Sequence, residues 1–101
     1  MKEDIQASLQ KLRVEINAHD KALLLILKKR FQVVKKVALL KKKHNLPILQ
    51  KARWKIIIED RIRMGLKLKI DKDFTSALMK LIHKESVRYQ ISLQQKKGTK
   101  K

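Results

Sequence analysis

The fold is decided by residues 9–41, LQKLRVEINAHDKALLLILKKRFQVVKKVALLK, a run that contains neither glycine nor proline. Leucine and lysine dominate this run, and both favour helices. Certain residues recur at alternating steps of four and three, which places them on one face of an α-helix. This face, called the first-helix stripe below, carries Leu9, Arg13, Ile16, Asp20, Leu23, Leu27, Arg30, Val34, Val37 and Lys41. The pattern predicts one long helix from Glu3 to His44.

Breaking signals divide the rest of the chain into two further helices. The segment 45–47, Asn-Leu-Pro, ends the first helix, and a second is expected from about Leu49 to Met64 with Gly65 as its C-cap residue. A third is expected to open after Asp71 and to continue to about Gln94. Apolar spacings of three and four rather than two argue against strands. The sequence therefore predicts an all-α fold of three helices per chain.

The first helix is too long to be covered by the two shorter helices of the same chain. Forty residues of helix span roughly 60 Å, whereas a compact domain of 100 residues has a radius of gyration of about 13 Å. A second copy of the chain, lying against the first-helix stripe, is the simplest way to bury it. We therefore expect an intertwined helical homodimer.

Length and composition indicate one small domain, residues 1–94, followed by a disordered basic tail at residues 95–101. The chain has no cysteine, which excludes a disulfide framework and a thiol nucleophile and fits a reducing, cytoplasmic setting. The longest unbroken apolar run, Ala22–Leu27, is far shorter than the roughly 20 residues that cross a bilayer. We therefore expect no membrane partner.

The charge balance raises nucleic acid as an alternative partner. The 27 basic and 9 acidic residues give a net charge of +18. Only six of the basic residues are arginine and only four residues are aromatic, whereas base readout and single-strand binding rely on those types. Gly65 and Gly98 are the only glycines, so no glycine-rich phosphate loop is present. A basic helical dimer that binds nucleic acid stays the second hypothesis.

Cations stand where a buried face is expected. Arg13, Arg30 and Lys41 lie on the first-helix stripe, and Arg53 falls on the apolar side of the second helix. A cation removed from water without a partner is destabilised by several kcal/mol. An anionic small molecule held between helices would meet these charges. The alternative is that each long side chain extends along the surface and keeps its charge in water.

The third helix adds neutral hydrogen-bonding groups to this set. Ser86 and Gln90 lie one turn apart and share a face with apolar Met79, Ile82 and Leu93. They could instead be a buried polar pair that neighbouring helices satisfy. The three histidines have no metal-ligand spacing, so we expect neither a metal nor a cofactor; they are His19, His44 and His83. Such a site suits a rearrangement of a dianion: guanidinium groups fix two carboxylates, and other donors stabilise charge developing on an ether oxygen.

Six of these residues, in this order and spacing, resemble the active-site pattern of the all-helical chorismate mutases: Arg13, Arg30, Lys41, Arg53, Ser86 and Gln90. The resemblance covers almost the whole chain. It implies an isomerase that converts chorismate to prephenate in phenylalanine and tyrosine biosynthesis, without covalent or acid-base catalysis. It also implies a homodimer formed by the long first helices, in which Arg13 serves the active site of the opposite subunit.

The resemblance further implies a role for each residue. Arg13 and Arg30 would clamp the substrate carboxylates, with Ser86 helping to hold one of them, and Arg53 would also bind substrate. Lys41 and Gln90 would donate to the ether oxygen. Because glutamine does not titrate, we expect a broad plateau of rate between about pH 6 and 8.

Two positions depart from the best-known form of the family, in which acidic residues approach the substrate hydroxyl from the start of the second helix. Here they are Gln50, which can still bind a hydroxyl, and Trp54, which we expect to be a packing residue or a pocket wall. Together with other residues they resemble a branch in which the mutase is joined to DAHP synthase, so a fused or associated DAHP synthase is an expected partner. The residues that carry this second resemblance are Pro47, Ile48, Leu49, Gln50, Arg53, Trp54, His83, Glu85, Ser86, Arg88 and Gln90.

Overall fold

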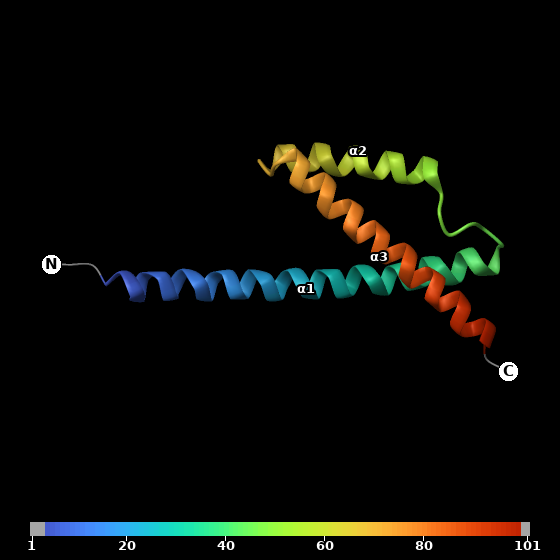
Figure 1. Ribbon diagram of the computed structural model, residues 1–101, viewed down its shortest axis with the longest axis horizontal. Coiled ribbons are helices and arrows are strands. Elements are labelled where there is room, and N and C mark those ends of the chain that lie inside the picture. The colour runs from blue at the N-terminus through green and yellow to red at the C-terminus, as the bar shows by residue number, and fades with distance from the viewer. Residues whose placement is uncertain (1–3, 100–101) are drawn as a thin grey trace. The chain divides into compact units, whose positions relative to one another are not determined.

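The computed structural model describes residues 4–99, with side chains described as far as Gln95 (Figure 1). Its elements are α1 (Ile5–Lys43), α2 (Lys51–Lys67) and α3 (Lys72–Thr99), and residues 4–99 include no strand. The prediction of three helices with a long first one is confirmed. The described chain falls into two compact units, one ending at Val33 and the other beginning at Val34.

The end of α1 is fixed by a left-handed residue and two hydrogen bonds. Asn45 has a φ of 56°, a conformation that asparagine tolerates better than most residues. Its backbone N–H donates to the Lys42 carbonyl at 3.3 Å, and the Leu46 N–H donates to the Lys41 carbonyl at 2.8 Å. This is the Schellman pattern of helix termination. The predicted break at residues 45–47 is thus confirmed, with a specific cause.

The predicted end of α2 at Gly65 is wrong. α2 continues to Lys67, and the left-handed position is Lys69, with a φ of 62°. The Ile70 N–H reaches back to the Gly65 carbonyl at 2.8 Å, so Gly65 accepts the closing hydrogen bond from within the helix. Glycine is needed there for another reason: a Cβ at this position would lie 2.7 Å from Oγ1 of Thr75. Gly65 allows α2 and α3 to approach closely.

α3 begins as predicted and ends later than predicted. The Asp71 carboxylate accepts the Phe74 N–H at 2.9 Å, which is the side-chain N-cap bond expected of an aspartate. The helix then runs to Thr99, beyond the expected end near Gln94. Its extension follows from the composition of residues 95–97, Gln-Lys-Lys, which are good helix formers. Residues 100–101 of the predicted tail lie outside the described residues.

The described chain buries little apolar surface by itself. In the second unit α2 packs against α3, and Figure 1 shows the two helices meeting at their connecting turn. Ala38, at 2% exposure, is the one buried apolar residue among those described. On the first-helix stripe Leu27 and Val34 are half-buried, and the exposed apolar members are Leu9, Ile16, Leu23 and Val37. Such surface needs a cover, and the predicted homodimer, which would supply it, stays a prediction.

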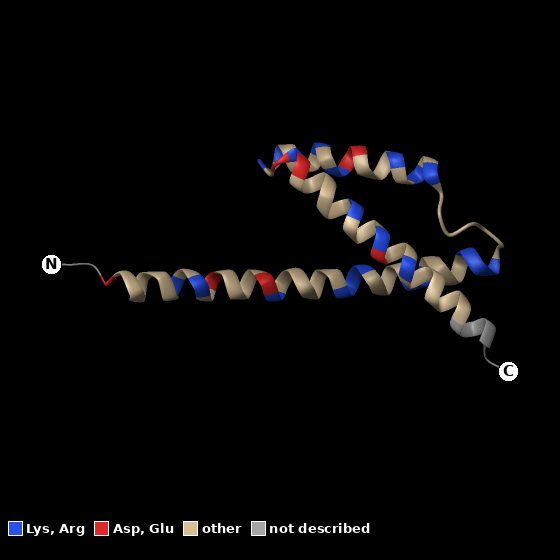
Figure 2. Ribbon diagram, in the orientation of Figure 1, with Lys and Arg blue, Asp and Glu red and all other residues tan. Residues whose placement is uncertain are grey.

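Charged residues occur on all three helices (Figure 2). The last turn of α1 carries Lys41, Lys42 and Lys43, where positive charge interacts favourably with the helix dipole. Across residues 4–99, none of the helices combines the length and the apolar character needed to span a membrane.

Candidate functional site

The candidate site is centred on the ammonium group of Lys41, near the C-terminal end of α1. Its Nζ donates to the side-chain Oε1 of Gln90 on α3 at 3.2 Å and to the backbone carbonyl of Ile48 at 2.6 Å. The three groups come from α1, α3 and the α1–α2 linker. The structure therefore brings Lys41 and Gln90, which lie 49 residues apart in the sequence, into direct contact.

The α1–α2 linker is hydrogen-bonded to both the backbone carbonyl and the side-chain ammonium of Lys41. The Lys41 carbonyl accepts the Leu46 N–H, and the Lys41 ammonium donates to the Ile48 carbonyl. The helix termination at Asn45 thus turns the chain back along the Lys41 side chain. Partial burial lowers the pKa of Lys41 below the ordinary lysine value, because desolvation disfavours the charged form.

Gln90 and Ser86 form the buried part of the site. Each is only 6% exposed, and they lie one turn apart on α3. Because Oε1 of Gln90 accepts from Lys41, the amide nitrogen of the same group points away from the ammonium. The Ser86 hydroxyl donates to the Ile82 carbonyl of its own helix at 2.9 Å. On α3, half-buried Met79, Ile82 and Leu93 accompany them, as the sequence predicted.

An aromatic pair stands next to these groups. Trp54 of α2 and His83 of α3 are stacked, with ring centroids 3.9 Å apart and ring planes inclined by 16°. His83 precedes Ser86 by three residues, so it lies on the same side of α3. The stack connects the first turn of α2 to the site-bearing face of α3.

The other predicted site residues occupy different surroundings. Arg53 is exposed in the first turn of α2, and Gln50 is exposed immediately before it, in an extended conformation. Arg13 and Arg30 belong to the first unit, where Arg13 is exposed and Arg30 is half-buried. Within the second unit the site is thus a lysine, a glutamine and a serine, with Arg53 and Gln50 at the start of α2.

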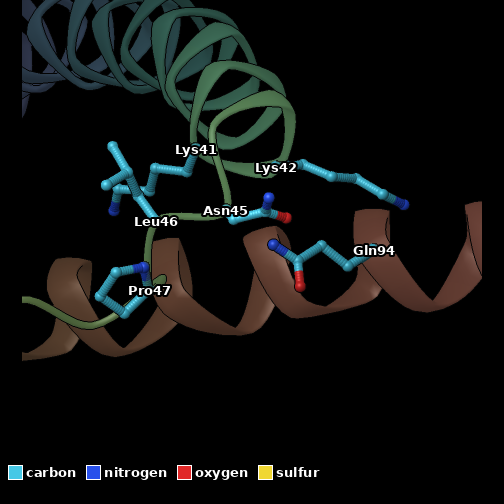
Figure 3. Close-up of a pocket in the computed structure, with 6 residues that line it drawn as sticks. All are labelled: Lys41, Lys42, Asn45, Leu46, Pro47 and Gln94. Atoms are coloured by element: carbon cyan, nitrogen blue, oxygen red, sulfur yellow. The ribbon is translucent and has the colours of Figure 1, made fainter.

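A small cavity also lies beside Lys41 and the α1–α2 linker. Its volume is about 370 Å³, and its lining residues are Lys41, Lys42, Asn45, Leu46, Pro47 and Gln94. Figure 3 shows the Asn45 and Gln94 side chains pointing toward each other, while Lys41 and Lys42 point to opposite sides. Neither Gln90 nor Ser86 lines this cavity. Lys41 is thus the one member of the Lys41–Gln90 pair that lines it.

Two features of the site could not be found by motif. The Ile48 carbonyl is a backbone group, and no residue type at that position signals that it accepts from Lys41. The partner of Trp54 was equally hidden, because Trp54 and His83 lie on different helices with no shared spacing.

Fold and site together define a class of protein: a small all-helical domain with cationic and neutral hydrogen-bonding groups at its site and no cysteine in its sequence. Residues 12–91 match the family model described as chorismate mutase type II. The chain is also 37% identical over 81 residues to a bifunctional chorismate mutase/prephenate dehydratase from Buchnera aphidicola subsp. Schizaphis graminum (strain Sg). The chain belongs to the chorismate mutase type II family.

The match confirms the predicted family and, with it, an assignment to the isomerases. The matched region includes all six residues that carried the resemblance. The similarity to the Buchnera protein covers 80% of this chain and 21% of that relative, so the chain corresponds to about a fifth of it. That relative's name joins the mutase to a prephenate dehydratase, and neither comparison supports the branch joined to DAHP synthase.

Proposed function

We propose that this protein catalyses the rearrangement of chorismate to prephenate, in the biosynthesis of phenylalanine and tyrosine. One observation carries the proposal: in a chain of this family, the Lys41 ammonium and the buried Gln90 amide lie within 3.2 Å of each other. Together they bring two donor-bearing groups, an ammonium and a carboxamide, next to each other. A rearrangement that transfers no proton to the protein needs mainly hydrogen-bond donors at its reacting oxygen.

The proposed chemistry is electrostatic. As the carbon–oxygen bond of the enolpyruvyl ether breaks ahead of carbon–carbon bond formation, negative charge develops on the ether oxygen. An ammonium has three donors, and Ile48 and Gln90 accept two of those of Lys41. The remaining donor and the Gln90 amide N–H would bind the ether oxygen. Donors fixed in advance stabilise such charge without reorganising, and one such donor typically contributes about 10²–10³ in rate.

The two substrate carboxylates would be held by guanidinium groups. A guanidinium binds a carboxylate through two parallel hydrogen bonds, which fixes orientation as well as position. Arg30 and Arg53 would act from their own chain and Arg13 from a second chain, with Ser86 and Gln50 as further substrate contacts. The exposed apolar members of the first-helix stripe support the homodimer that this arrangement needs. The net charge of +18 would also attract a dianion before it binds.

The expected association with DAHP synthase and the cytoplasmic location remain predictions. The relative's name favours prephenate dehydratase as the kind of domain that a mutase of this family is joined to. Co-purification of the full-length protein from its own cells would identify which enzyme, if either, accompanies the mutase.

The direct test is the loss of chorismate absorbance on adding the purified chain, with Arg30→Ala as control, at moderate salt so that surface charges are screened. We expect turnover by the wild type and a severe loss in the variant. Absence of turnover in the folded wild type would refute the proposed function. Equal turnover in both proteins would remove Arg30 from the proposed clamp.

The role of Arg13 across subunits is tested by mixing two inactive variants, Arg13→Ala and Lys41→Met, under conditions that exchange subunits. A mixed dimer would contain one site with both residues intact and one with neither. Random exchange should therefore restore roughly a quarter of the wild-type activity. If both residues of a site come from one chain, mixing restores nothing.

A further inference from the structure

The α1–α2 linker closes a small ring on Lys41. The ring begins at the Lys41 backbone carbonyl, which accepts the Leu46 N–H at 2.8 Å. It ends at Ile48, whose carbonyl accepts from the Lys41 ammonium at 2.6 Å. Pro47 alone separates the two contacts. A short stretch of linker thus holds both the backbone and the far end of the side chain of one residue.

The two hydrogen bonds of the ammonium differ in length. The bond to the Ile48 carbonyl is 2.6 Å long, whereas the bond to Oε1 of Gln90 is 3.2 Å long. Shorter hydrogen bonds from a charged donor are the stronger ones. A lysine side chain has a long, flexible stem, so its direction depends on the groups that bind its end. The Ile48 carbonyl is the closer of the two groups that fix the direction of this ammonium.

Backbone restrictions bring the Ile48 carbonyl to this place. Asn45 occupies the left-handed region, with a φ of 56°. Pro47 fixes its own φ and confines the residue before it, Leu46, to extended conformations. Because these three consecutive residues are restricted, the path from the end of α1 to Ile48 has little conformational freedom. The Lys41 ammonium is therefore held by a stiff segment.

Asn45 acts on this arrangement through its backbone. Its side chain is exposed and points toward Gln94 (Figure 3), whereas the ammonium binds Ile48 and Gln90. Glycine adopts a positive φ readily, and a β-branched residue with a positive φ is an outlier. The backbone contribution of Asn45 can therefore be kept in Asn45→Gly and removed in Asn45→Val.

We propose that Asn45 and Ile48 are positioning residues for the proposed reaction. The left-handed turn at Asn45 carries the Ile48 carbonyl onto the Lys41 ammonium, and this contact aims the remaining donor of the ammonium at the reacting oxygen. The inference rests on the proposed function for the identity of the reaction. A catalytic group misplaced by about 1 Å can lower a rate by about 10²-fold. A hydrogen bond accepted from the ammonium also favours its charged form, so the contact affects the pKa of Lys41 as well as the rate.

Asn45→Val and Asn45→Gly test the turn. Asn45→Val should lower kcat by roughly 10- to 100-fold with KM within about threefold of wild type. It should also lower the pKa of Lys41 further below the ordinary lysine value, which moves the alkaline decline of the rate to lower pH. Asn45→Gly should stay within about twofold of wild type in kcat, with the same pKa. NMR shifts of the Lys41 side chain, assigned with Lys41→Met, give this pKa in the full chain without any need for turnover.

Lys69→Val is the matched control. Lys69 is the other non-glycine residue with a positive φ within the described part of the chain, at 62°, and it lies in the turn between α2 and α3. The substitution introduces the same backbone conflict as Asn45→Val. It should lower stability to a similar extent and leave kcat and the pKa of Lys41 unchanged. Equal changes of both quantities in the two variants would overturn the proposal, because general loosening would then explain them.

The Ile48 carbonyl is tested separately by replacing Leu49 with its α-hydroxy acid. This replacement turns the amide between residues 48 and 49 into an ester, whose carbonyl is a weaker acceptor, and it keeps every side chain. The pKa of Lys41 and kcat should both fall, as in Asn45→Val. The ester keeps the proposal testable if Asn45→Val fails to fold.

Failure of this inference is distinguishable from failure of the proposed function. If the folded wild type has no turnover, the mutase is refuted, and a lowered pKa of Lys41 in Asn45→Val and in the ester would still support the hold on Lys41. Full turnover with an unchanged pKa of Lys41 in both would overturn the positioning and retain the mutase. A fall in kcat without a change in that pKa would also overturn it, because the loss would not act through the ammonium.

Discussion

Replacing Gly65 with alanine should destabilise the protein, although alanine is the better helix former. In an open helix the change would stabilise by about 1 kcal/mol. Here the new Cβ would lie 2.7 Å from Oγ1 and 3.2 Å from Cγ2 of Thr75. Thr75 is 8% exposed, and its hydroxyl donates to the Asp71 carbonyl at 3.0 Å. A β-branched side chain on a helix has little freedom to move away.

The size of the effect follows from these opposing contributions. Overpacking of this kind destabilises by about 1–3 kcal/mol, and loss of the Thr75 hydrogen bond by about 1 kcal/mol more. After the gain in helix propensity, we expect a net loss of about 1–3 kcal/mol. In a domain of this size that corresponds to a fall in Tm of roughly 4–24 °C.

The assay is thermal and urea unfolding followed by circular dichroism, at one fixed protein concentration because association would shift Tm. Thr75→Ala and the double variant complete a double-mutant cycle. The double variant should be more stable than the sum of the two single changes predicts, because Thr75→Ala removes the atoms that clash. A Gly65→Ala protein more stable than wild type would refute the close-approach argument.

Three further predictions concern helix ends and pH. Asp71→Ala should lower stability by about 1 kcal/mol through loss of the α3 N-cap, read from the same unfolding curves. Lys69→Gly should raise stability by about 0.5–1 kcal/mol by relieving the left-handed backbone, and a loss would show that the lysine side chain contributes more than the strain. Because burial lowers the pKa of Lys41, its ammonium is lost as pH rises through that lowered value. The alkaline decline of the mutase rate should therefore have its midpoint below 10.5, above a flat region from about pH 6 to 8 where Gln90 does not titrate. A steep change within that region would contradict the role of Gln90.

The helices were predictable because their signals are local. Uninterrupted helix-forming composition specified α1, and Asn45 and Asp71 carried their terminal roles in their own side chains. Gly65 misled the prediction, since a glycine near a helix end is usually a cap, while here a residue on another helix requires its small size. Lys69 has no side-chain signal for a left-handed conformation.

The candidate site was predictable in its residue types and less so in its contacts. Lys41, Ser86 and Gln90 could be placed on helix faces from spacing alone, because each face repeats every three or four residues. The hydrogen bond to the Ile48 carbonyl and the stack of Trp54 on His83 depend on how the linker returns and how α2 meets α3. Those are long-range relations that no single helix encodes.

The most direct test of the central claim compares chorismate turnover in Lys41→Met and Lys42→Met. The two lysines are neighbours on α1, both are half-buried, and the chemical change is the same. Lys41 donates a hydrogen bond to Gln90, so loss of its ammonium should lower kcat by about 10²-fold or more. Lys42→Met should stay within about twofold of wild type. Equal activities in the two variants would contradict the account.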